Sequence, residues 1–214
     1  VDLSRIPSLI SLVRLDVVAV LYFSLTIELL TRGWRWKLIL GKDNASFYYF
    51  VAGWVIGALF NNLFPARAGE FVRSFYLGRK KVVPTAEAFG SVVLERFLDG
   101  IVILFLIGTA FSLYAVNSEL KKAGYLAAVF YFGVFLAIVL LLFKQKWFEA
   151  ILEVLLKPLP ENWRIKVKAG QKSFVQGFSL IGRPWPFFSV LALSFFTWGF
   201  SVFSYFLLLQ AFSL

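Results

Sequence analysis

Glu87, Ser91, Glu95 and Asp99 are spaced four residues apart in the sequence, next to and within a long apolar block. Residues four apart share one face of an α-helix, so these side chains would form a single polar stripe. Two carboxylates so close to each other would repel, and one would tend to take up a proton. A cationic partner is therefore expected, either the neighbouring Arg96 or an arginine from another segment.

A charge inside a bilayer is costly enough to need a reason. One interpretation of the intramembrane polar cluster Glu95, Arg96 and Asp99 is a buried cavity that holds a lipid headgroup or relays a proton. The other interpretation is a structural ion cluster that locks helices together. The sequence leaves both open.

A second polar motif combines a helix break with a basic helix face. It comprises Asn61, Asn62, Pro65, Arg67, Gly69, Glu70 and Arg73. Proline cannot donate a backbone hydrogen bond, so a helix should end near Asn62 and another can begin at Pro65. In transporters, broken helices of this kind form binding sites, and arginine grips phosphate bidentately. We therefore predict that a lipid headgroup is bound by Asn61, Asn62, Arg67, Glu70 and Arg73. The alternative is an interfacial loop whose positive charge only orients the chain.

The elements that would position these motifs are apolar helices. The chain has 214 residues, of which 60% are hydrophobic and 16% charged, whereas soluble domains are about 45–50% apolar and about 25% charged. The apolar residues form blocks, and a helix needs about 20 residues to cross a bilayer. We predict an all-α, polytopic integral membrane protein with a single membrane domain over residues 1–214. About five transmembrane helices are expected, together with a broken or re-entrant segment. The expected spans lie near 16–31, 47–64, 88–114, 123–143 and 186–209.

The connections between the blocks carry most of the positive charge. Residues 31–46 are basic and Trp-rich, as is typical of the membrane interface, and residues 144–183 are expected to form amphipathic helices on the cytoplasmic surface. In the predicted topology, the N-terminus, residues 64–86 and residues 144–183 lie on one side of the membrane. That side carries more Lys and Arg than the other. The positive-inside rule then predicts a multi-pass protein of the cytoplasmic (inner) membrane with a cytoplasmic N-terminus. That parity changes if the second apolar block is re-entrant.

Composition also excludes several functions. The chain contains no Cys, His or Met, which removes thiolate nucleophiles and the commonest metal ligand and general base. No metal site, no cofactor, no catalytic residue and no enzymatic activity are predicted. The chain has a net charge of +10, and its positively charged residues lie in the connections between apolar blocks. Membrane lipids are therefore the expected partners, and nucleic acid is not.

The two polar motifs belong to a longer pattern that resembles the lysylphosphatidylglycerol synthase transmembrane region, also called the flippase-like or UPF0104 family. The pattern consists of Arg35, Trp36 and Leu40, then Gly53, then the motif from Asn61 to Arg73, then Leu94, Glu95, Arg96 and Asp99. The resemblance is specific over residues 35–100 and weaker to Leu214. It implies an all-helical membrane domain that handles a charged or phosphate-bearing lipid. In bifunctional members this domain moves aminoacylated phospholipid between leaflets.

Two departures from the family pattern limit what the resemblance implies. The soluble aminoacyl-transfer domain is absent, so synthase activity is not implied. The family's membrane region usually continues through further helices, so we expect the chain to be truncated at its C-terminus, either as a fragment or as a shortened member.

The motifs and the resemblance together predict a flippase-like protein that binds, and can translocate, a lipid with an anionic or aminoacylated headgroup. The alternative is a non-catalytic structural subunit of a larger membrane protein complex. The 26 Phe residues would supply its lipid-facing or partner-facing surface. A membrane enzyme acting on a polyprenyl-phosphate lipid is a third possibility, less favoured because no nucleotide-binding motif is present.

Overall fold

The computed structural model describes residues 14–64, 68–113, 117–143, 153–158 and 160–211, and every regular element in these ranges is helical. The prediction of an all-α chain is confirmed. The elements are α2 (Leu15–Leu40), α3 (Phe47–Leu63), α4 (Gly69–Arg79), α5 (Thr85–Leu113), α6 (Ser118–Phe143), α8 (Glu161–Gln176), the 3-10 turn η3 (Ser179–Gly182) and α9 (Pro184–Ala211).

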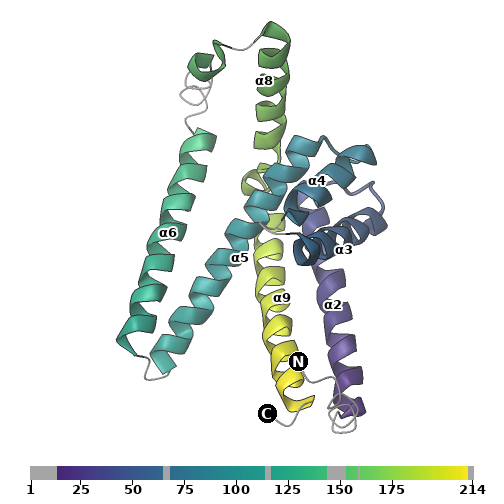
Figure 1. Cartoon of the computed structure of the whole chain (residues 1–214), viewed down its shortest axis with the longest axis vertical. Coiled ribbons are helices and arrows are strands. Elements are labelled where there is room, and N and C mark those ends of the chain that lie inside the picture. Colours follow the sequence, from purple (N-terminus) through teal and green to yellow (C-terminus); the bar gives the residue numbers. More distant parts are fainter. Residues whose placement is uncertain (1–13, 65–67, 114–116, 144–152, 159, 212–214) are drawn as a thin grey trace.

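Helices α2 and α9 pack as an antiparallel pair (Figure 1). The face of α9 that is buried carries small hydroxyl side chains, namely Ser194, Thr197, Ser201 and Ser204. Small residues allow two helices to approach closely, and their hydroxyl groups can bond across the interface. Ser24 of α2 and Ser204 of α9 do so, with 2.9 Å between their Oγ atoms.

Hydrogen bonds join α2 and α9 at both ends of the pair. At one end, the backbone N–H of Arg14 donates to the carbonyl oxygen of Ala211. At the other end, the guanidinium of Arg183 donates to the carbonyl oxygens of Leu38 and Ile39, which lie in the last turn of α2, where the regular i+4 donors are missing. The two helices therefore form one antiparallel unit along their whole length.

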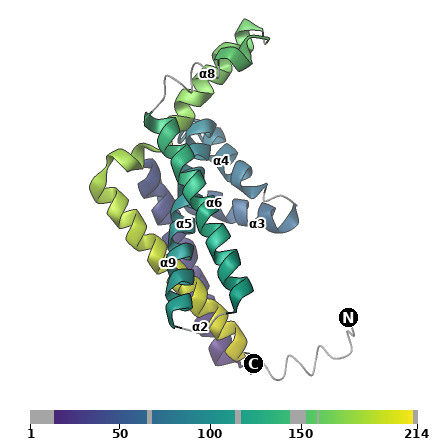
Figure 2. The same ribbon diagram turned by 90° about the vertical axis from the view of Figure 1, so that its left-hand side faces the viewer.

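Helices α3 and α4 form a short hairpin to one side of the long helices (Figures 1 and 2). The helix break predicted near Asn62 is present, since α3 ends at Leu63 and α4 begins at Gly69. The two helices cross closely: a Cβ atom on Gly69 would collide with the carbonyl oxygen of Gly57. The side-chain oxygen of Asn61 accepts a 2.9 Å hydrogen bond from the backbone N–H of Gly69, so it satisfies a free donor at the start of α4.

The hairpin returns the chain to the end at which α2 stopped. Lys42, just beyond α2, forms a 3.1 Å ion pair with Glu87 at the start of α5. Arg14 therefore lies at the opposite end of α2 from residues 80–87. At about 1.5 Å per residue, the 26 residues of α2 separate them by about 39 Å. Arg14 and residues 80–87 thus lie at opposite ends of α2, whereas the predicted topology grouped the N-terminus with residues 64–86 and 144–183. The side of the membrane that each end faces stays a prediction.

By length and composition, two of the described helices are candidates for crossing a membrane, residues Ser118–Ala137 of α6 and Pro184–Ala211 of α9. Charged side chains interrupt α2 and α5, and α3 has 17 residues, fewer than the about 20 that a span needs. The prediction of five spans is therefore not confirmed.

The structure describes parts of two other predicted segments. Residues 31–46 were expected at the interface, but α2 continues to Leu40 and Trp36 is fully buried. Within residues 144–183, α8 packs its C-terminal end on the start of α5, where the rings of Phe174 and Phe89 lie 6.1 Å apart. Residues 144–152 of that segment lie outside the described residues.

Candidate functional site

Three arginines and three carboxylates from three helices meet at one place, which we call the ion cluster. Its members are Arg35 of α2, Glu70 and Arg73 of α4, and Glu95, Arg96 and Asp99 of α5. The predicted polar stripe on α5 thus receives its cations from Arg96 and from two other helices. The six formal charges cancel.

Arg35 is the most deeply buried cation of the cluster. Its side chain is fully buried, and its guanidinium lies 2.6 Å from Glu95 and 2.5 Å from Asp99. A third bond, of 3.0 Å, goes to Ser194 Oγ of α9. Guanidinium has five donors in a planar fork and keeps its charge, so it can hold two carboxylates at once. Arg35 therefore ties α2, α5 and α9 together.

Arg73 connects the hairpin to the same carboxylates. Its guanidinium nitrogens lie 2.7 Å from Glu70 and 3.0 Å from Glu95, and its positive charge lies 5.0 Å from the ring centre of Trp36, within the range of a cation–π contact. The N–H groups of Arg73 are buried but are not aligned for a hydrogen bond with any group of the described residues. A buried donor without a hydrogen bond costs free energy. A ligand that accepts hydrogen bonds from Arg73 would remove that cost.

Arg96 lies at the edge of the cluster, with 36% of its side chain exposed. It is 3.2 Å from Glu95, 3.5 Å from Asp99 and 3.7 Å from Glu70. Its contacts are longer than those of Arg35, so Arg96 is the cation that can most readily take another partner.

A polar cavity of about 470 Å³ opens against Arg73, and this volume is within the usual range for small-molecule sites. It is lined by Arg32, Trp54, Gly57, Ala58, Asn61, Asn62, Glu70, Arg73, Arg96, Trp198 and Tyr205. Arg32 is bound to Glu28 at 2.7 Å and lies 4.9 Å over the ring of Trp54. With three arginines and two asparagines in its wall, the cavity suits an anionic or phosphate-bearing group.

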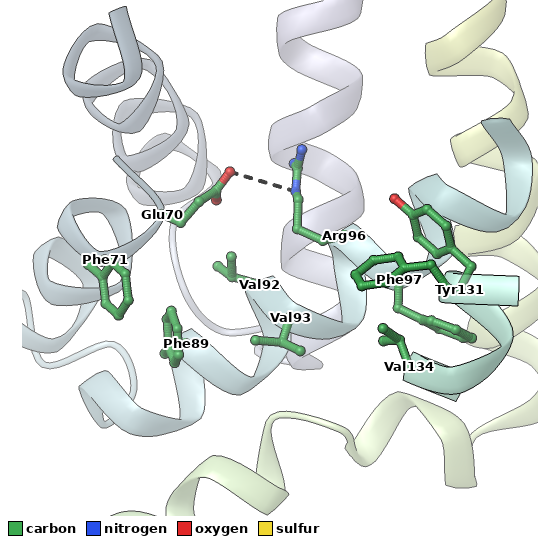
Figure 3. A pocket seen from close by; sticks show the side chains of 10 residues that line it. Glu70, Phe71, Phe89, Val92, Val93, Arg96, Phe97, Tyr131 and Val134 are labelled. Carbon is green, nitrogen blue, oxygen red and sulfur yellow. Dashed lines mark ion pairs between the residues drawn. The ribbon is translucent and has the colours of Figure 1, made fainter. Parts of the chain in front are cut away.

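An apolar pocket of about 390 Å³ lies beside the polar cavity, between α4, α5 and α6 (Figure 3). Aromatic and branched aliphatic side chains form most of its wall, namely Phe71, Phe89, Val92, Val93, Phe97, Phe130, Tyr131 and Val134. Its polar lining residues are Glu70 and Arg96, which also line the polar cavity. A polar compartment and an apolar compartment thus share one ion pair as a wall.

The structure brings most of the predicted site residues together. Asn61, Asn62, Glu70 and Arg73 line the polar cavity, and Arg67 lies outside the described residues. Asn62 donates from its side chain to the carbonyl oxygen of Ala58 in its own helix. Among the residues of the predicted intramembrane cluster, Arg96 reaches the cavity, whereas Glu95 and Asp99 are buried behind it.

Sequence reasoning left Arg35 out of the predicted site because it stands in a Trp-rich basic run that looks interfacial. The lining residues Arg32, Trp54 and Trp198 were also missed. Glu28 and Arg32 are four residues apart, which is the spacing of a helical ion pair. That spacing could have been used to predict that the first helix continues past residue 31 and includes Arg35.

Comparison with known proteins shows the family to which the chain belongs. The family model of the lysylphosphatidylglycerol synthase TM region matches residues 1–214. A UPF0104 membrane protein of Methanocaldococcus jannaschii is 35% identical over 75 residues, which are 33% of this chain and 22% of that protein. The glycosyltransferase AglD of Haloferax volcanii is 35% identical over 82 residues, which are 36% of this chain and 13% of that protein.

The match therefore covers less than a quarter of either relative's length. No solved structure matches the chain. The expected resemblance is confirmed, since the family model covers the whole chain. The chain is a membrane protein that belongs to the lysylphosphatidylglycerol synthase TM region family.

Proposed function

We propose that the polar cavity binds the phosphate-bearing headgroup of a membrane lipid, and that the protein moves such lipids between leaflets without making or breaking a covalent bond. The observation that carries the proposal is Arg73, whose buried and misaligned N–H donors face a cavity of about 470 Å³. Phosphate oxygens accept such donors in pairs, and charge-assisted bonds of this kind are about twice as strong as neutral ones.

The shared wall between the two compartments supports a lipid rather than a soluble anion. A phospholipid has a charged head directly attached to apolar chains. A polar cavity beside an apolar pocket offers a place for each part, while a free anion would use only one. The name of the family refers to an aminoacylated phospholipid, and an aminoacylated headgroup still carries the phosphate that Arg73 would bind.

A membrane topology follows from the same proposal. The four long helices α2, α5, α6 and α9 would cross the bilayer, and the α3–α4 hairpin would be re-entrant, so that its break borders a cavity instead of lipid. The hairpin lies at the end that carries Lys42, Lys80, Lys81 and the basic residues of α8. The positive-inside rule would make that end cytoplasmic and place the start of α2 on the other side. The cell membrane is the proposed location, and the cytoplasmic leaflet the proposed source of lipid.

A structural subunit of a larger complex is the second candidate, and α6 favours it. None of the described side chains of α6 is buried, and Phe130 and Phe132 are each 66% exposed. Such a face offers a partner helix a surface of exposed aromatic side chains. The charge balance of the ion cluster would also serve a purely structural role.

Lipid binding in nanodiscs separates the two candidates. Protein carrying the substitution Arg73→Gln is compared with wild type and with Arg79→Gln, which removes an exposed arginine from the end of the same helix. We expect wild type to retain phosphatidylglycerol over phosphatidylcholine, Arg73→Gln to lose at least tenfold in affinity, and Arg79→Gln to be unchanged. Mass spectrometry of the retained lipids provides the readout.

If Arg73→Gln does not fold, Asn62→Leu tests the cavity without touching the ion cluster and should also weaken binding. The binding proposal would be refuted if wild type retained no anionic lipid, or if all variants bound equally well. Vesicles with a fluorescent lipid in one leaflet then test movement. Bound lipid without leaflet exchange would limit the function to binding, and stoichiometric partner proteins without lipid would favour the structural subunit.

A further inference from the structure

Glu70 occupies a particular position in the wall between the two compartments. It lines the polar cavity and the apolar pocket, and Figure 3 shows its ion pair with Arg96 above the apolar side chains. One oxygen of its carboxylate is 2.7 Å from Arg73 and the other is 3.7 Å from Arg96. The Glu70 carboxylate thus bridges the two guanidiniums that an entering phosphate would meet.

Glu70 also differs from the other two carboxylates of the ion cluster. Arg35 holds Glu95 and Asp99, whose side chains are 0% and 4% exposed. Glu70 makes no ion pair with Arg35, and 18% of its side chain is exposed. Of the three carboxylates, it is the one that can leave without breaking the contacts of the buried arginine.

From these contacts we infer that Glu70 is an internal counter-ion that a lipid phosphodiester displaces. This inference rests on the proposed function and adds an event to it. A phosphodiester carries one negative charge and two non-bridging oxygens, so it can replace a carboxylate charge for charge between Arg73 and Arg96. While the site is empty, Glu70 keeps the six charges of the cluster balanced, which limits the cost of two buried cations.

The apolar pocket determines which phosphates can make the exchange. Glu70 lines one side of this pocket. Phe71 and Phe130, which also line it, are 63% and 66% exposed, so a hydrocarbon chain can enter from the side. A lipid would gain burial of one hydrocarbon chain when its phosphate replaces Glu70, and inorganic phosphate would gain nothing there. The ligand class is therefore a phosphodiester lipid, with its chain between α4, α5 and α6.

If Glu70 is a displaced counter-ion, removing its charge should strengthen lipid binding, whereas removing a side chain that binds the lipid would weaken it. Removing the internal carboxylate with Glu70→Gln should strengthen the binding of phosphatidylglycerol by about tenfold, because the phosphate no longer competes with a charge-assisted contact. Glu87→Gln is the matched control. Glu87 is a buried carboxylate that pairs with Lys42 but lines neither compartment, and its substitution should leave affinity unchanged. Glu70→Asp, with a shorter reach to Arg96, should give an intermediate affinity.

The experiment titrates detergent-purified full chains with phosphatidylglycerol and, separately, with inorganic phosphate, and follows Trp fluorescence. Val93→Trp, which fills the apolar pocket, should weaken lipid binding and leave phosphate binding unchanged. If wild type binds the lipid but Glu70→Gln binds it equally or more weakly, the displacement is refuted and the proposed function stands. If neither binds the lipid, both are refuted. If Glu70→Gln binds inorganic phosphate as tightly as the lipid, the chain pocket has no role and the lipid assignment is wrong.

Discussion

Arg35 should be the largest single electrostatic contributor to the stability of this fold. Its side chain is fully buried, and it lies within 2.6 Å of Glu95 and 2.5 Å of Asp99. The substitution Arg35→Met keeps much of the side-chain volume but removes the charge, which leaves three carboxylates facing two arginines. Removing one partner of a buried ion pair typically costs about 3–5 kcal/mol, because the remaining charge is uncompensated. We expect a loss of that size in the free energy of unfolding.

Reversible unfolding in mixed micelles, with increasing dodecyl sulfate and Trp fluorescence as the signal, measures this loss. Arg14→Met is the matched control. Arg14 forms an ion pair of 2.7 Å with Asp16, but the two side chains are 58% and 67% exposed, so the loss should be at most about 1 kcal/mol. The double variant Arg35→Met, Asp99→Asn restores neutrality and should recover part of the stability. An Arg35→Met loss no larger than that of Arg14→Met would contradict the buried, mutually compensated cluster.

Two further predictions concern helix contacts. Gly69→Ala should lower the free energy of unfolding by about 1–3 kcal/mol through overpacking, because the added methyl group would meet backbone of α3; the same assay measures it, and Gly133→Ala, which has open space around it, should not destabilise. Ser204→Ala should cost about 0.6 kcal/mol, the average for hydrogen bonds between membrane helices, whereas the double change with Ser24→Ala should cost little more, since the bond they share is already lost; a fully additive double loss would show that the two hydroxyl groups are not coupled.

The local features of the site could be predicted from sequence because each depends on spacing within one segment. The residues of the stripe around Glu95 and Asp99 are four apart, and Pro65 follows two asparagines at the end of an apolar run. Such signals specify a helix face and a helix end whatever the rest of the chain does. The structure accordingly contains the helix break, and the carboxylates lie on one side of α5.

The partners of those residues could not be predicted, because they are set by packing between distant segments. Arg35 and Trp36 resemble an interfacial anchor in sequence, and contacts with α5, some 60 positions away, bury them instead. The return of the α3–α4 hairpin likewise depends on the close approach of Gly57 and Gly69. A run of apolar residues has the same composition whether it crosses a bilayer or turns back, so composition alone does not distinguish a span from a hairpin.

The fastening of α2 and α9 at both ends has a consequence for motion. A pair held by Arg14 at one end and Arg183 at the other should open only as a cooperative unit, and its amides should exchange with solvent last. Helix α6 contributes no buried side chain among those described and packs mainly on α5, so its amides should exchange early. A movement that admits a hydrocarbon chain would then occur between α5 and α6, while α2 and α9 stay in place.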